Sequence, residues 1–208
     1  MRKLWILCLS LIATVCLLSA CQFDFGTDGL AFCPLDDGTY AVEVGEAKYL
    51  SEVLIPATYK GKTVSTIGKS AFANCKNLKS ITIPNSVTTI GERAFYNCTS
   101  LTSVTIPDSV TTIGDYAFYN CTGLTSVTIG DGVTSISDDA FYNCTDLTSV
   151  TIPNSVTEIG DRAFYECTSL TSIKYRGTRK QWNAISKGSD WNFNTGNFTI
   201  TYNYTGEE

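Results

Sequence analysis

A unit of 23 residues repeats through the middle of this chain almost without change. Four consecutive copies begin at Pro84, Pro107, Gly130 and Pro153, and a more divergent copy ends before them at Ile83. The copies that begin at Pro84 and Pro107 share 19 of their 23 positions. One unit of this size cannot bury its apolar face alone, because neighbouring units must cover it. The period therefore predicts a solenoid in which stacked copies form one continuous core.

Polar and apolar residues alternate in the Leu-Thr-Ser-Val-Thr-Ile segment of each copy, which predicts a strand. Strands one turn apart should pair in parallel. Val-Thr-Thr-Ile predicts a second, shorter strand, and the acidic residue after the following Gly predicts the start of a helical turn through Ala-Phe-Tyr-Asn. Each apolar position of the unit should form an inward column. The column with the largest side chains contains Phe72, Phe95, Phe118, Phe141 and Phe164.

The unit also resembles a known family. Its Ile-Gly-x-x-Ala-Phe-x-x-Cys core, followed by Leu-x-x-Val-x-Ile-Pro, is similar to the BspA-like class of bacterial leucine-rich repeats over residues 53–175. Gly130 in place of Pro and Ser137 in place of Gly are small departures. The resemblance implies an α/β repeat solenoid, a curved and right-handed leucine-rich-repeat array of short parallel strands with single-turn helices. Members of that family are mostly surface or secreted proteins, and some bind host matrix or plasma glycoproteins.

A solenoid needs a cap at each end, and both flanks of the repeats (residues 64–175) are patterned as caps. Residues 39–63 should form an N-terminal cap and a first irregular turn. Within that cap, residues 39–44 and 49–55 should pair as a hairpin. Residues 176–208 should form the C-terminal cap.

The C-terminal cap has a recognisable helix start. Thr178 and Gln181 have the spacing of a capping box, which predicts a helix with Trp182 and Ile185 pointing inward. Gly188 should end this helix. The alternating residues that follow, 197–204, predict a last strand.

The first residues predict an export signal. Arg2 and Lys3 precede an apolar stretch too short for a comfortable membrane span. The stretch ends in Leu-Ser-Ala-Cys, which resembles the lipobox of bacterial lipoproteins. The resemblance implies that residues 1–20 are a lipoprotein signal peptide and that Cys21 becomes a lipidated first residue, followed by a tether through residue 38. We therefore expect a cell-envelope protein that is lipid-anchored and surface-exposed, with an ordinary signal peptide or an uncleaved anchor as the alternative.

The composition excludes several functional classes. The chain has no His, which removes Ser-His-Asp and Cys-His catalysis and the commonest metal ligand. Its 20 acidic residues outnumber its 15 basic residues, which disfavours nucleic-acid binding. Near-identical units also leave no unique set of residues for catalysis. We therefore predict no enzyme, no cofactor and no metal site, and membrane contact through the lipid anchor only.

Two sets of side chains are candidates for a binding face. Hydroxyl groups should face outward from the longer strands, and a tyrosine should follow each Phe of the inward column on the convex surface. Exposed tyrosines could contact protein or sugar, whereas half-buried packing and an ordinary soluble β face are the alternatives. The candidate residues are Ser103, Thr105, Ser126, Thr128, Ser149, Thr151, Tyr96, Tyr119, Tyr142 and Tyr165.

Two further columns could carry chemistry. The first contains Cys75, Cys98, Cys121, Cys144 and Cys167. These cysteines could form disulfides or bind a soft metal ion. Side chains that are in register point the same way, however, which disfavours disulfides between them, so we expect reduced and buried thiols. The second contains Glu92, Asp115, Asp138 and Asp161. Stacked carboxylates could gather Ca²⁺, but we expect helix N-caps and turn solvation.

Together these features predict a lipid-anchored bacterial surface protein, a monomer, whose repeat array mediates protein–protein interaction or adhesion. The expected partner is an extracellular protein or glycoprotein. A structural surface spacer without a specific ligand and a polysaccharide-binding surface protein are the alternatives.

Overall fold

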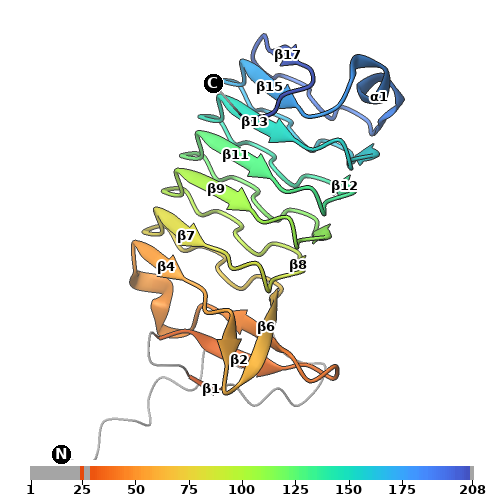
Figure 1. The fold of residues 1–208 in the computed structure, drawn as a ribbon. Coiled ribbons are helices and arrows are strands. Elements are labelled where there is room, and N and C mark those ends of the chain that lie inside the picture. Colours follow the sequence, from red (N-terminus) through yellow and green to blue (C-terminus); the bar gives the residue numbers. More distant parts are fainter. Residues whose placement is uncertain (1–23, 26–28, 207–208) are drawn as a thin grey trace, which may run out of the picture.

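The computed structural model describes residues 24–25 and 29–206, which form a solenoid with a cap of different structure at each end (Figure 1). Each turn of the solenoid contributes a longer strand, a shorter strand and a segment of tight turns. Figure 1 shows the longer strands following one another along the array. This arrangement confirms the parallel, stacked-repeat solenoid that the period predicts.

The longer strands pair in parallel at the offset of one repeat. Ser126 lies beside Ser103 on one side and beside Ser149 on the other. The last five longer strands form one sheet and the first two form a separate pair. The backbone N–H of Thr102 donates to the carbonyl of Lys79 at 3.1 Å and joins the two groups. These strands are β4 (Glu52–Leu54), β7 (Ser80–Thr82), β9 (Ser103–Ile106), β11 (Ser126–Ile129), β13 (Ser149–Ile152), β15 (Ser172–Tyr175) and β17 (Thr199–Thr201).

The shorter strands form a second parallel ladder. Ile90 lies between Ile67 and Ile113, so each copy of the unit again pairs with the same position of the next. The first three belong to a seven-stranded sheet that includes the N-terminal cap, and the last three form a sheet of their own. These strands are β6 (Lys62–Ile67), β8 (Thr89–Ile90), β10 (Thr112–Ile113), β12 (Ser135–Ile136), β14 (Glu158–Ile159) and β16 (Ser186–Lys187).

The third segment of each unit consists of turns, so the predicted single-turn helices are wrong. Two residues of each such segment adopt left-handed backbone, for example Arg93 (φ 57°) and Asn97 (φ 60°). Left-handed residues interrupt a right-handed helix. The backbone groups bond to the next turn instead, as the N–H of Phe95 does to the carbonyl of Ala117 at 2.7 Å. These bonds make a third ladder, which we call the turn ladder.

The predicted apolar columns are buried inside these three ladders. Each Phe of the inward column has 0% exposure, and neighbouring rings stack with centroids 5.0–5.4 Å apart. The Val, Ile and Leu columns lie around them in the same core. Because every unit supplies the same side chains, the packing of one turn repeats in the next.

The N-terminal cap differs from the predicted hairpin. β3 (Tyr40–Glu43) pairs antiparallel with β2 (Ala31–Pro34) and parallel with β6. The residues after β3 form the 3₁₀ turn η1 (Gly45–Tyr49), which leads into β4, and β4 pairs with the longer strand β7 instead of with β3. The cap therefore begins before residue 39 and includes part of the predicted tether. Two short strands complete it: β1 (Asp24–Phe25) pairs with β2, and β5 (Thr58–Tyr59) pairs with β6.

The C-terminal cap contains the helix α1 (Arg179–Ala184), which starts with the predicted capping box between Thr178 and Gln181. Trp182 is buried against Tyr175, with ring centroids 5.2 Å apart. The helix ends at Ala184 with Ile185 as its C-cap, so Gly188 does not end it. The N–H of Gly188 instead continues the shorter-strand ladder by donating to the carbonyl of Ile159.

Candidate functional site

Hydroxyl side chains cover the outer face of the longer strands. Val104, Val127 and Val150 point into the core, so the serine and threonine before and after each valine point outward. The exposure of this face falls along the array. Ser103, Thr105 and Ser126 are exposed, Thr128 and Ser149 are half-buried, and Thr151 is buried between Thr128 and Lys174 in the register.

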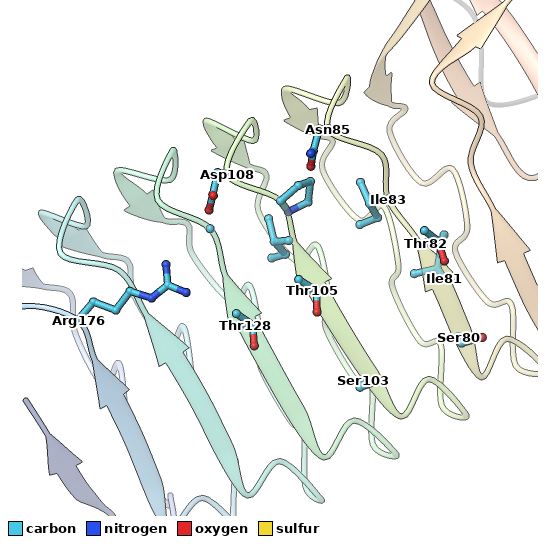
Figure 2. Close-up of a pocket in the computed structure, with 13 residues that line it drawn as sticks. Ser80, Ile81, Thr82, Ile83, Asn85, Ser103, Thr105, Asp108, Thr128 and Arg176 are labelled. Atoms are coloured by element: carbon cyan, nitrogen blue, oxygen red, sulfur yellow. The ribbon is translucent and has the colours of Figure 1, made fainter. Parts of the chain in front are cut away.

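A shallow groove of about 600 Å³ runs across this face at β7, β9 and β11 (Figure 2). The outward hydroxyls form its floor, and the residues that follow each strand form one rim. Figure 2 shows the Arg176 side chain reaching toward that rim. The lining residues used below are Ser80, Thr82, Asn85, Ser103, Thr105, Asp108, Thr128 and Arg176.

Arg176 closes one end of the groove by an ion pair that spans two turns. Its guanidinium lies 2.7 Å from the Asp131 carboxylate, although the two residues are 45 positions apart. The N–H of Asp131 donates to the Asp108 carboxylate at 2.9 Å. The groove therefore has hydroxyl groups on its floor and charged groups on its rim. The repeat pattern did not indicate Arg176, because it lies in the first non-repeated segment.

The candidate tyrosines lie in the turn ladder and are absent from the lining of the groove, so the two sets of predicted residues do not form one site. Neighbouring tyrosine rings stack with centroids 4.7–5.0 Å apart and planes within 8° of parallel. Phe193 continues the stack beyond Tyr165 at 5.0 Å and is 54% exposed. Each interior ring has both faces covered, so a sugar could stack on an end ring but not on Tyr119 or Tyr142.

A row of asparagine side chains accompanies the stacked tyrosines. The amide of each residue donates to the amide oxygen of the previous one at 2.6–2.8 Å, from Asn143 through Asn120 and Asn97 to Asn74. Glu166 takes the next position and accepts a hydrogen bond from Asn194 at 2.6 Å. This row was missed in the sequence, where a constant Asn gives no sign that its side chain bonds to its own copies.

The cysteine column is reduced and buried, as predicted. Each thiol from Cys98 onward donates to a Phe carbonyl of the previous turn, for example Cys98 to Phe72 at 3.0 Å. Burial raises the pKa of Cys75 to about 11 and that of Cys121 to about 12. The thiolate that metal binding and thiol exchange require is therefore disfavoured at neutral pH.

The acidic column does not cap helices, which corrects the predicted N-caps. The carboxylates of Asp138 and Asp161 accept backbone N–H groups of the next turn, at 2.7 Å from Asp161 and 2.6 Å from Ser189. Glu92 pairs with Lys69 at 2.7 Å, and this hydrogen bond lowers the pKa of Glu92. Within the described residues, no group of three or more Cys, Asp or Glu side chains is placed to hold a metal ion.

A family model for the BspA-type leucine-rich repeat region matches residues 52–189 in six copies. The chain belongs to the BspA-type leucine-rich repeat family. The match extends to both sides of the four near-identical units, so it includes the longer strand β4 and the shorter strand β16.

Three bacterial leucine-rich proteins of known structure are similar to this chain. The T. pallidum protein is 25% identical, with a TM-score of 0.68 over 86% of this chain and 85% of that one. A leucine-rich cell surface protein of Faecalibacterium prausnitzii is 32% identical, with a TM-score of 0.63 over 90% of this chain and 56% of that one. A protein of Eubacterium ventriosum is 24% identical, with a TM-score of 0.64 over 81% of this chain and 50% of that one. This chain spans about half the length of the latter two. A comparison with curated proteins finds no match.

Cys21 and the predicted signal peptide of this BspA-type chain fall outside the residues that the structure describes. Among the residues that the structure describes, no helix has the length and apolar character to cross a membrane.

Proposed function

We propose that this protein is a lipid-anchored bacterial surface protein that binds an extracellular protein or glycoprotein on the outer face of its longer strands. The observation that carries the proposal is the groove over β7, β9 and β11, with hydroxyl groups on its floor and Asp108 and Arg176 on its rim. Hydroxyls can donate and accept hydrogen bonds, and they can therefore pair with an extended backbone or with polar side chains. The similarity to a leucine-rich cell surface protein of Faecalibacterium prausnitzii supports the location.

A panel of matrix and plasma proteins, set beside a glycan array, tests the binding proposal. Thr105→Lys places a long cation on the groove floor and should abolish binding to any protein that the unaltered chain captures. Thr112→Lys is the matched control, because Thr112 is exposed on β10 in the other ladder. Equal binding by both variants contradicts the use of this face, and binding to glycans alone supports the polysaccharide alternative. A chain that binds neither panel would favour the structural spacer.

The anchor is tested separately. Cys21→Ala should abolish metabolic labelling with a fatty acid and release the protein from membranes or leave it unprocessed, because the acyl chains attach at that thiol. Unchanged labelling of the variant contradicts the anchor.

We propose no enzymatic role. The family supports a binding function, and the absence of His from the whole sequence removes the usual general base.

A further inference from the structure

Charge is distributed unevenly along the array. From residue 45 to residue 79, six lysines accompany two acidic residues. From residue 80 to residue 175, only three basic residues accompany ten acidic residues. The first turn is therefore basic, although the turns that follow it and the chain as a whole are acidic.

Apolar side chains are exposed at the same basic end. Four large apolar residues are exposed within the described part of the chain, and three of them are Tyr49 (68%), Leu50 (46%) and Leu54 (67%). Tyr49 ends η1, and Leu54 points outward from β4, whose neighbour Val53 is buried. The equivalent outward positions of the next strands carry threonine, for example Thr82 beside Leu54. The outward side chains of the first turn are thus apolar at positions where the following repeats carry polar side chains.

Lysines and apolar residues lie close together there. The Lys48 ammonium lies 4.9 Å from the centre of the Tyr49 ring. The backbone N–H of Lys79 donates to the carbonyl of Ser51 at 2.7 Å, which holds the Lys76–Lys79 loop beside the start of β4. Figure 1 shows η1 and β4 together at this end of the array. We call this surface the first-turn patch; it consists of Lys48, Tyr49, Leu50, Leu54, Lys76 and Lys79.

The acidic residues of this end leave the patch basic. Glu46 and Glu52 are the two carboxylates in the same stretch of chain, and Glu52 is exposed on the same side of β4 as Leu54. Three lysines of the patch therefore stand against two carboxylates. Asp36 and Asp37 lie in the β2–β3 turn beside Thr39, whose hydroxyl is 2.7 Å from that of Ser65 on β6. That turn therefore belongs to the shorter-strand side, away from the start of β4.

The chain enters the fold at this end as well. β2 begins at Ala31, ten residues after Cys21, and pairs with β3 inside the N-terminal cap. Ten extended residues span at most about 36 Å. A lipid anchor at Cys21 would therefore keep the first-turn patch close to the membrane that holds it.

We propose that the first-turn patch rests on an anionic phospholipid surface and orients the array, with the acidic turns pointing away from the membrane. This inference rests on the proposed anchor for the proximity of the membrane, and it adds a contact beyond the lipid itself. Lysines are attracted to anionic headgroups, and exposed leucine and tyrosine side chains enter the boundary between headgroups and acyl chains. The patch combines both chemistries.

The test measures binding without the acyl chains. The chain from residue 21 onward, carrying Cys21→Ser, is sedimented with vesicles of phosphatidylcholine alone or of phosphatidylcholine with phosphatidylglycerol. We expect binding to the anionic vesicles only, and loss of that binding in about 0.5 M salt. The double variant K76E/K79E should weaken binding by at least about tenfold, since each lysine near such a surface contributes about fivefold.

The control is R179E/K180E, which makes the same change of charge at the exposed start of α1 and should leave vesicle binding unaltered. Leu54→Ser should weaken binding without changing its salt dependence, and circular dichroism checks that each variant is folded. Equal binding by the two double variants overturns the proposal, as does binding to soluble heparin but not to anionic vesicles. A negative result with vesicles does not affect fatty-acid labelling at Cys21. The membrane contact of the first-turn patch and the lipid anchor are therefore tested independently.

Discussion

At the scale of the residue, each thiol of the cysteine column from Cys98 onward donates to a Phe carbonyl of the previous turn, and the column is free of disulfides. Burial, rather than a covalent partner, therefore protects these side chains. Burial has a different consequence for Glu43, a carboxyl group that loses a proton near neutral pH. Burial at the edge of the N-terminal cap, against Gly68, raises its pKa from 4.5 to about 7.

The thiols of the cysteine column should react with an alkylating reagent only after denaturation, and without prior reduction. Raised pKa values and burial both suppress the reactive thiolate in the folded protein. Mass spectrometry of alkylated peptides, before and after addition of guanidinium, would identify each site. A peptide of the column that stays unmodified after denaturation until a reductant is added would show a disulfide and contradict the reduced column.

Glu43→Gln should stabilise the protein above pH 7. Because the pKa of Glu43 rises on folding, the folded state binds more protons than the unfolded state between pH 4.5 and about 7. The free energy of unfolding should therefore fall as the pH rises through that window, by about 1–3 kcal/mol in all. Urea unfolding at pH 4.5 and pH 8 measures this dependence, which Glu43→Gln should reduce and the exposed control Glu46→Gln should not. Equal pH dependence in the unaltered protein and in Glu43→Gln would contradict the assignment.

At the scale of the element, asparagine stabilises the turn ladder in two ways, through its backbone conformation and through its side-chain amide. Asn120 has left-handed backbone (φ 57°), and its amide bonds to both neighbouring turns, Asn97 at 2.6 Å and Asn143 at 2.7 Å. Asparagine tolerates this backbone conformation better than other non-glycine residues. A right-handed helix would need neither the left-handed backbone nor the amide hydrogen bonds between turns.

Two substitutions of Asn120 separate these features. Asn120→Gly keeps the backbone accessible but removes the amide, and should cost about 1–2 kcal/mol through two lost hydrogen bonds. Asn120→Ala should cost about 1–2 kcal/mol more, because alanine is strained in the left-handed region. Urea unfolding measures both values. Equal stability of the two variants would show that the backbone conformation contributes nothing.

At the scale of the whole molecule, every turn contacts mainly its neighbours, so a defect should act according to its position. Phe118 is the central ring of the inward column, with two stacked rings on either side. Phe164 is the last ring and contacts Trp191 of the C-terminal cap, with centroids 6.3 Å apart.

Phe118→Ala should uncouple the array and broaden its unfolding transition, whereas Phe164→Ala should fray the C-terminal end first. Each substitution removes about 3–5 kcal/mol of packing. Far-UV circular dichroism reports the whole array through a urea titration. Tryptophan fluorescence reports the C-terminal cap, because Trp182 and Trp191 are the tryptophans beyond the predicted signal peptide. Coincident transitions in both variants would show that the domain unfolds as one block.

The sequence by itself determined the repeat, the parallel register and the buried columns, because an exact period forces each residue to meet its own copy in the next turn. It also predicted the reduced cysteines and the capping box of α1, which depend on local spacing. Tertiary structure decided the rest. Backbone bonds between turns replaced the expected helices, pairing of β2 with β3 replaced the expected hairpin, and ring stacking covered the faces of the tyrosines. Arg176 reached Asp131 across two turns, and Tyr49, Leu50 and Leu54 met lysines at one end of the array, because residues far apart in a non-repeating stretch come together only when the chain folds.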